Sequence, residues 1–169
     1  MRDLGDPMAM IDAQREWRRD DGYSITNDPA RVDVDVVHGF LVRSYWASGI
    51  TRDVIERAVA HSLNFTILDP GGAQVGFCRV TSDYATFAYL MDVFVLEAHR
   101  GRKLGEWLIE TVMAHPLLQG LRVFRLATAD AHGLYQKYGF RTLAHPERMM
   151  EIVDPAVYAG NPAEKEQAR

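Results

Sequence analysis

The feature that most constrains the fold is a long apolar strand pattern that runs directly into a basic, glycine-containing turn. Residues 86–96 are rich in aromatic and β-branched side chains, which favours a β-strand. The turn 99–105 follows, and apolar side chains then recur at helical spacing at Leu104, Trp107, Leu108, Thr111 and Val112. A helix that begins just after a strand presents unpaired backbone N–H groups beside the strand's carboxyl end, where an anion can bind.

The other patterns predict a mixed α/β domain. Before the long strand, the sequence predicts a strand over 22–28, a helix over 31–43, a helix from the N-cap Thr51, and a hairpin of 65–68 with 75–80. After it, we expect a helix stopped by Pro116, a strand over 122–128, a helix over 131–138, and strands over 140–143 and 149–153.

Length and composition fit one globular domain. The 169 residues allow a single core, and 47% hydrophobic with 25% charged residues is ordinary globular composition. We expect a flexible N-terminal arm over 1–21 that includes a short helix over 8–18, a domain over 22–153, and a polar tail over 154–169.

Charge and residue counts exclude several classes of function. The single Cys78 excludes an intramolecular disulfide and a multi-thiolate zinc site, and the scattered histidines predict no metal site. A net charge of −4 argues against nucleic-acid and anionic-membrane partners. The chain has no membrane-spanning apolar stretch and no secretory signal, so we expect a cytoplasmic protein.

The basic turn has two features that a bound phosphate would explain. Arg100, Arg102 and Lys103 lie at the start of a helix, where cations oppose the helix dipole. Gly101 and Gly105 allow the backbone to approach a ligand closely. The alternative is a solvated basic turn in which the glycines serve only the bend.

This segment resembles the acetyl-coenzyme A pyrophosphate loop of the GCN5-related N-acetyltransferase (GNAT) superfamily, whose pattern is [Q/R]-x-x-G-x-G/A after a strand. Arg100 matches its first position and Gly105 its last, whereas Lys103 stands where the middle glycine is expected. A lysine fits there if its φ is negative.

A second segment, 131–140, resembles the superfamily's A-x-x-x-Y-x-K-x-G-F stretch, with Tyr135 at the tyrosine position. Thr128 stands where the family often has asparagine. The residue-level alternative is a helix with Tyr135 packed in the core.

The resemblance implies a central, mostly antiparallel sheet flanked by helices, and acetyl-coenzyme A (acetyl-CoA) as the co-substrate. It implies that the coenzyme contacts Phe94, Val95, Arg100, Gly101, Arg102, Lys103, Leu104, Gly105 and Thr128. An amine would attack the thioester directly, a backbone N–H near Val95 would bind the oxyanion, and Tyr135 would protonate the departing thiolate.

The general base and the acceptor are less defined. Asp92 is the first candidate base, since a carboxylate is unusual in an apolar strand; a structural aspartate is the alternative. Asp83, Tyr84 and Tyr89 are weaker candidates, and an ordered water relay is another. Tyr45, Trp46 and Tyr84 are candidate substrate-binding residues, although Tyr45 and Trp46 could instead cap the helix pair.

Together these features predict an N-acetyltransferase that acts on the primary amine of a small molecule, as a monomer or homodimer and without a metal. The negative net charge favours a cationic small molecule. The alternatives are a protein or peptide N-acetyltransferase and a non-catalytic acyl-CoA-binding module.

Overall fold

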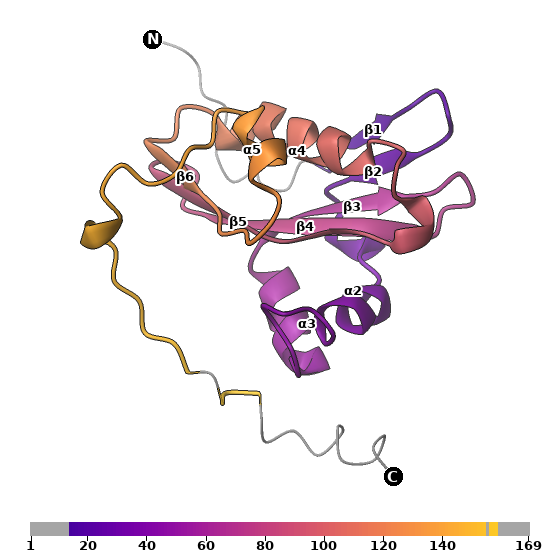
Figure 1. Ribbon diagram of the computed structural model, residues 1–169. Helices are drawn as coiled ribbons and strands as arrows, with labels where there is room; N and C mark the ends of the chain where they lie inside the picture. Colours follow the sequence, from indigo (N-terminus) through magenta and orange to yellow (C-terminus); the bar gives the residue numbers. More distant parts are fainter. Residues whose placement is uncertain (1–13, 155, 159–169) are drawn as a thin grey trace.

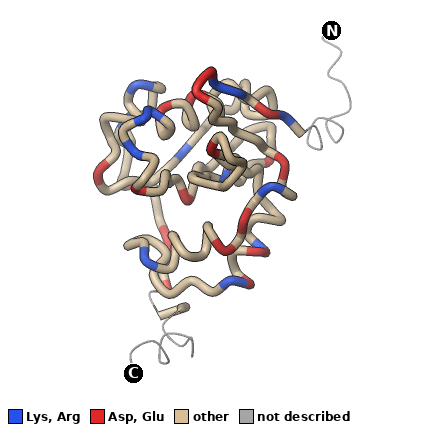
Figure 2. Tube along the Cα trace, turned by 90° about the vertical axis from the view of Figure 1, so that its right-hand side faces the viewer, with Lys and Arg blue, Asp and Glu red and all other residues tan. Residues whose placement is uncertain are grey.

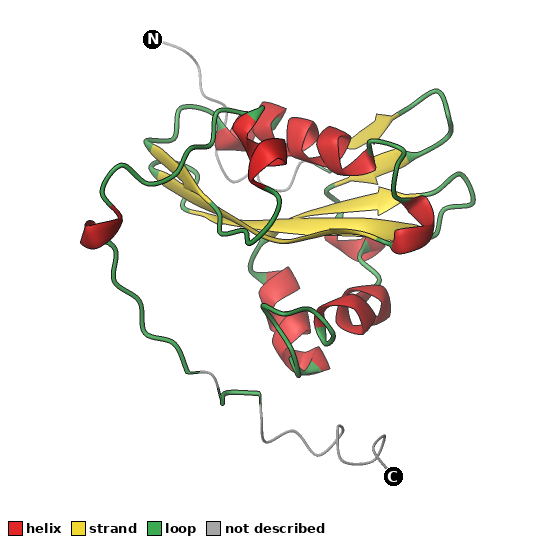
Figure 3. Ribbon diagram, in the orientation of Figure 1, coloured by secondary structure: helices red, strands yellow, loops and turns green. Residues whose placement is uncertain are grey.

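The chain folds around one twisted sheet with helices on both faces (Figures 1 and 3). The structure is a computed structural model and describes residues 14–154 and 156–158. In those residues the sheet has six strands in the order β1-β2-β3-β4-β5-β6. Its first four pairings are antiparallel, and β5 and β6 pair in parallel. The mixed α/β class and the mostly antiparallel sheet are therefore confirmed.

The strands are β1 (Glu16–Arg18), β2 (Ser24–Thr26), β3 (Leu63–Leu68), β4 (Gln74–Ser82), β5 (Phe87–Val95) and β6 (Val123–Arg125). The α-helices are α2 (Val34–Leu41), α3 (Arg52–Ala60), α4 (Leu104–Ala114) and α5 (His132–Gln136). Short 3₁₀ turns lie at Pro29–Arg31, Glu97–His99, Pro116–Leu118 and Pro146–Arg148.

The sheet separates two apolar clusters. α4 and α5 cover the upper face in Figure 1, and α2 and α3 cover the lower face. β4 serves both, because Cys78 packs in the α4 cluster while its neighbour Phe77 packs in the α2/α3 cluster. Successive strand residues point to opposite faces, so a strand covered on both sides reads as a continuous apolar run.

A β-bulge in β5 turns the end of this strand. Phe77 pairs with Phe94, yet Arg79 pairs with Met91, so β5 has one extra residue at this point. Asp92 lies there with a φ of 56°. Leu90 packs in the α4 cluster and Phe94 in the α2/α3 cluster, so the bulge changes the face that the strand presents.

Two predicted segments differ from the structure. Glu16–Arg18 forms an edge strand paired with β2, although we expected an arm with a helix there; residues 1–13 lie outside the described residues. The expected strands over 140–143 and 149–153 are not formed. This segment turns at Pro146–Arg148 and runs away from the sheet (Figure 1), leaving Met150 and Ile152 fully exposed. Without a neighbouring edge to supply hydrogen bonds, an apolar stretch does not become a strand.

Candidate active site

The site begins where the two parallel strands separate. β5 and β6 pair only over residues 87–89 and 123–125. β5 then continues to Val95 without β6 beside it, while the chain after β6 leads away toward α5. The carboxyl ends of parallel strands, and the crevice between them, are where α/β sheets bind ligands.

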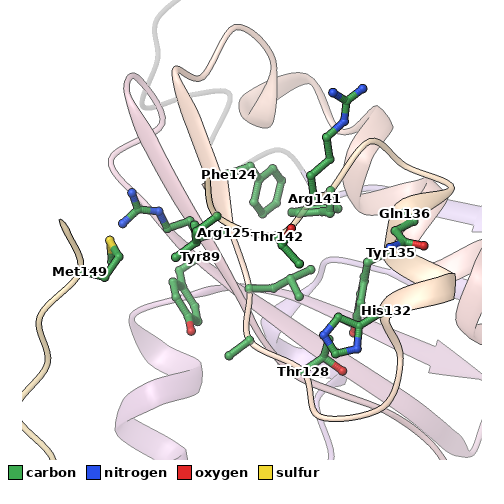
Figure 4. A pocket seen from close by; sticks show the side chains of 14 residues that line it. Tyr89, Phe124, Arg125, Thr128, His132, Tyr135, Gln136, Arg141, Thr142 and Met149 are labelled. Carbon is green, nitrogen blue, oxygen red and sulfur yellow. The ribbon is translucent and has the colours of Figure 1, made fainter. Parts of the chain in front are cut away.

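A pocket of about 380 Å³ lies along this divergence (Figure 4). Its lining comes from β5, from β6 and the residues after it, from α5, and from residues 140–143 with Met149. Thr128, His132 and Tyr135 lie together at one side of the pocket in Figure 4, and Tyr89, Arg125 and Met149 lie at the other. The pocket therefore spans the gap from α5 to the edge of the sheet.

The basic turn lies between the end of β5 and the start of α4. Arg100 folds back, and its Nε donates to the Val95 carbonyl at 3.1 Å. Lys103, the N-cap of α4, has a φ of 58°. The condition for a lysine at this position, a negative φ, is therefore not met: Lys103 adopts the left-handed conformation that favours glycine, at a cost of roughly 1–2 kcal/mol.

The N-terminus of α4 has free donors and free space. No side chain caps it, and the first intrahelical bond runs from the Trp107 N–H to the Lys103 carbonyl at 3.0 Å. The amides of 104–106 therefore point out of the helix unpaired. A Cβ built on Gly101 or Gly105 would meet no atom within 4 Å. These glycines leave room for a phosphate against the amides.

Arg19, which follows the edge strand β1, holds the turn in place through a contact that the sequence analysis did not predict. Its Nη1 donates to the Arg102 carbonyl at 3.1 Å, and its guanidinium lies 5.3 Å from the centre of the Trp107 ring. It also pairs with Asp21. Because 83 residues separate Arg19 from Arg102, no local motif could reveal the contact.

Tyr135 projects from α5 into the pocket and is 7% exposed. Burial, and to a smaller degree the neighbouring Cys78, raises the pKa of Tyr135 to about 12. Thr128 fixes the start of α5, because its Oγ1 accepts from the Ala131 N–H at 3.0 Å. His132, one turn before Tyr135, is a lining residue that the sequence analysis did not single out.

Asp92 has both carboxylate oxygens engaged. Oδ2 accepts from Arg79 Nε, and Oδ1 accepts from Trp46 Nε1 at 3.2 Å. The ion pair is mostly buried, with 18% of the Arg79 side chain and 9% of the Asp92 side chain exposed. Because both oxygens already accept hydrogen bonds, this geometry suits Asp92 to positioning Trp46.

Tyr45 and Trp46, in the loop between α2 and α3, bridge the two diverging strands. Trp46 reaches Asp92 in β5, and the Tyr45 hydroxyl accepts from the Ala129 N–H at 3.2 Å, beyond the end of β6. Their rings meet edge to face, with centroids 4.9 Å apart. Tyr45 is 68% exposed and Trp46 43%, so neither is a core residue. The structure brings these candidates to the mouth between the strands.

The turn between β4 and β5 is not brought to the site. Asp83 accepts from the amides of Ala85, Thr86 and Phe87, and hydrogen bonds from Thr86 and these amides hold the pKa of its carboxyl well below the usual range. Tyr84 has a φ of 57° in the same turn. This turn lies at the amino end of β5, whereas the strands separate toward the carboxyl end. Tyr89, the other weak candidate, does line the pocket.

One other group matters for the chemistry available. Cys78 is fully buried, and desolvation raises the pKa of its thiol well above the ordinary value, which disfavours a thiolate nucleophile.

Over residues 14–154 and 156–158, no cluster of three metal-ligating side chains is found. In the same residues, no helix is long and apolar enough to cross a membrane.

The fold and this site define an acyltransferase-like α/β protein, and comparison with known proteins specifies the family. Residues 44–142 match the model of the acetyltransferase (GNAT) domain. A predicted GNAT-family acetyltransferase from Xanthomonas campestris pv. campestris is 48% identical, with a TM-score of 0.78 over 81% of this chain and 96% of that one. The chain therefore belongs to the GNAT family of acetyltransferases.

More distant relatives agree with this assignment. A predicted acetyltransferase of Gibberella zeae is 29% identical over 77% of this chain and 84% of its own length. A predicted acetyltransferase from Deinococcus radiodurans, at 20% identity, has a TM-score of 0.66 over 86% of this chain and 98% of that one. The second likeness supports the fold alone.

Proposed function

We propose that this acetyltransferase moves the acetyl group of acetyl-CoA directly to the primary amine of a small molecule. The observation that carries the proposal is the pocket between the diverging strands, with Tyr135 in its wall and the open N-terminus of α4 at the end of β5. Acetyl-CoA is the donor that GNAT acetyltransferases generally use, and it supplies an activated thioester.

The chain's residues fit the diphosphate and the pantetheine arm of this donor. The amides of 104–106 and the space at Gly101 and Gly105 suit the diphosphate, with the Arg102 and Lys103 side chains nearby. Leu104 is buried and fixes the first turn of α4.

The backbone of β5 at Phe94 and Val95 suits the amide groups of pantetheine, and Arg100 holds the turn against the strand through the Val95 carbonyl. Thr128 lies at the opposite wall, where it fixes the start of α5.

Proton removal from the acceptor is the first chemical need, because a free alkylammonium has a pKa of about 10.4. We assign this step to His132, with the ordered water relay as the other route. Its imidazole lies on the pocket wall, one turn from Tyr135, and a ring nitrogen can accept a proton from the acceptor amine. In this scheme Asp92 is a positioning residue, since Arg79 and Trp46 occupy its oxygens.

Stabilisation of the departing coenzyme A thiolate is the second chemical need, and Tyr135 provides it as a hydrogen-bond donor. With its pKa raised to about 12, the phenol stays protonated throughout the physiological range. A full proton transfer to a thiolate of pKa about 8.5 would cost about 5 kcal/mol, at 1.36 kcal/mol per unit. Tyr135 therefore stabilises the thiolate through a charge-assisted hydrogen bond, and solvent supplies the proton afterwards.

The test is release of free coenzyme A from acetyl-CoA with a panel of free amines and a lysine-containing peptide. Turnover with free amines and little with the peptide is expected, because the pocket of about 380 Å³ suits a small acceptor. Turnover with the peptide alone would make the protein a peptide acetyltransferase. Tight binding of acetyl-CoA with no turnover would make it a binding module.

A further inference from the structure

An arginine without a counter-charge lies in the same pocket as Tyr135. Arg125, the last residue of β6, has a buried Nε without a hydrogen-bond partner. Among the described residues, no carboxylate lies within ion-pair distance of its guanidinium. The guanidinium carbon lies 6.0 Å from the centre of the Phe87 ring. A buried donor left unpaired is costly, so Arg125 is prepared for an anion that the chain itself does not supply.

The surroundings of Arg125 do not neutralise it. The residues lining the pocket include Arg125, Arg141 and His132 but no aspartate or glutamate. In Figure 4 the Arg141 guanidinium points away from the other labelled side chains, whereas the Arg125 guanidinium extends along the side of the pocket where Met149 lies. Acidic and basic residues otherwise alternate over the molecule (Figure 2), so this is a local feature and not part of a basic face.

On the acceptor wall, the Asp92 carboxylate is not free. Asp92 is the acidic side chain beside Trp46, and Arg79 already neutralises it. A cationic acceptor would meet Arg125 and find no unpaired counter-ion on Asp92. The net charge of the chain favoured a cationic substrate, but the charges that line the pocket do not. Charges close to the substrate affect its binding more strongly than charges far away on the surface, which solvent and salt screen.

Arg125 is placed to reach the far end of an acceptor. It is the register partner of Tyr89, so both side chains project from the same face of the sheet. That is the face on which Tyr45 binds the Ala129 amide, four residues beyond Arg125 along the chain. An amine that attacks a thioester near Tyr135 therefore has the rest of its molecule within the same pocket as Arg125.

We propose that the acceptor is a small amine that also carries an anionic group, a carboxylate or a phosphate, and that Arg125 binds this group. The inference rests on the proposed function, since it names the acceptor class for the same site. A guanidinium holds carboxylates and phosphates through paired hydrogen bonds, which makes Arg125 a specificity-determining residue.

The experiment compares matched amines with and without the anion: 2-aminoethyl phosphate against ethanolamine, and γ-aminobutyrate against n-butylamine. We expect the wild type to prefer the anionic member of at least one pair by about 10-fold or more in kcat/KM. Arg125→Gln should lower kcat/KM for that anion-bearing amine by about 10- to 100-fold and change kcat/KM for its partner without the anion by no more than about twofold. Arg125→Lys should keep part of the preference.

Controls separate the possible failures. Arg122→Gln removes an exposed arginine three residues earlier that does not line the pocket, and it should keep the preference. Methyl phosphate should inhibit the wild type in competition with the amine and not with acetyl-CoA, which tests the site without any variant.

The inference is wrong if the wild type prefers the amines that lack the anionic group, if Arg125→Gln slows all amines equally, or if this variant weakens the binding of acetyl-CoA. Turnover without anion preference would leave the proposed function standing. Failure to bind acetyl-CoA would defeat the proposed function itself.

Discussion

Replacing Gly105 by alanine should separate the stability of the fold from the affinity for acetyl-CoA. Gly105 lies in the first turn of α4 with an ordinary helical backbone, and a Cβ there would meet no atom within 4 Å. Alanine is favoured over glycine in helices by about 0.5–1 kcal/mol, so Gly105→Ala should raise the free energy of unfolding by about 0.5 kcal/mol. A glycine that costs stability and relieves no clash is explained by the close approach of a ligand.

The same change should weaken coenzyme binding, because the methyl group would occupy the space beside the amides of 104–106. We expect a loss of about 3- to 10-fold in acetyl-CoA affinity for Gly105→Ala. The bulkier side chain of Gly105→Val should lower the affinity for acetyl-CoA by about 10- to 100-fold, which corresponds to the loss of one or more charge-assisted hydrogen bonds.

Isothermal titration calorimetry gives the affinity, and urea unfolding gives the stability. The matched control is Gly133→Ala in α5, where a Cβ also meets no atom within 4 Å. Wild-type affinity in both Gly105 variants would refute the placement of the diphosphate at α4.

Three further outcomes are expected. Lys103→Gly should raise the free energy of unfolding by about 0.5–1 kcal/mol, because glycine adopts the left-handed backbone without strain, whereas Lys103→Ala should not raise it. Equal unfolding curves for the two variants would show that the backbone at Lys103 is not strained. Tyr135→Phe should lower kcat by about 10- to 100-fold with little change in the Kd of acetyl-CoA, and a near-normal kcat with chemistry rate-limiting would leave Tyr135 as a packing residue.

Burial, with a smaller effect from Arg15, lowers the pKa of His115 to about 4, while the unfolded chain takes up that proton near pH 6.5. Stability should therefore be complete above about pH 6.5 and fall by about 3 kcal/mol as the pH decreases to 4, a slope that His115→Gln should reduce in urea titrations. An unchanged slope in His115→Gln would assign the effect to other groups.

Elements fixed by local patterns were predictable from the sequence. The hairpin of β3 and β4 follows from the turn Asp69-Pro70-Gly71-Gly72, in which Asp69 Oδ1 accepts from the amides of Gly71 and Ala73. The sequence analysis also predicted the helix pair α2 and α3, and the unit in which β5 leads through a turn into α4, in the correct kind and order. Each of these elements is marked by its own periodicity and end residues.

The errors arose where distant residues decide the conformation. A lysine at position 103 fits the loop if its φ is negative, but in the passage from β5 into α4 this residue is left-handed. Glu16–Arg18 became a strand because β2 offers it an edge, which local polarity does not reveal. Residues 140–143 and 149–153 were predicted as strands, yet no described strand pairs with them.

The chemistry of the site depended most on such distant contacts. Asp92 stood out as a carboxylate in an apolar strand, but alternation alone could not show the bulge or the partners Arg79 and Trp46 that occupy its oxygens. Arg125 lies in an apolar strand pattern and draws attention only once its side chain is seen without a partner. A sequence shows which residue types are present, whereas neutralisation of their charges depends on the tertiary fold.

The most direct test of the central claim is to follow the acetyl group itself. Acetyl-CoA labelled with ¹³C in the acetyl group is incubated with the protein and 2-aminoethyl phosphate, and the products are measured by mass spectrometry. The account predicts one labelled acetyl group on the amine nitrogen for each coenzyme A released, with none on the protein. Coenzyme A released with the label found only as free acetate or attached to the protein would contradict direct transfer to an amine.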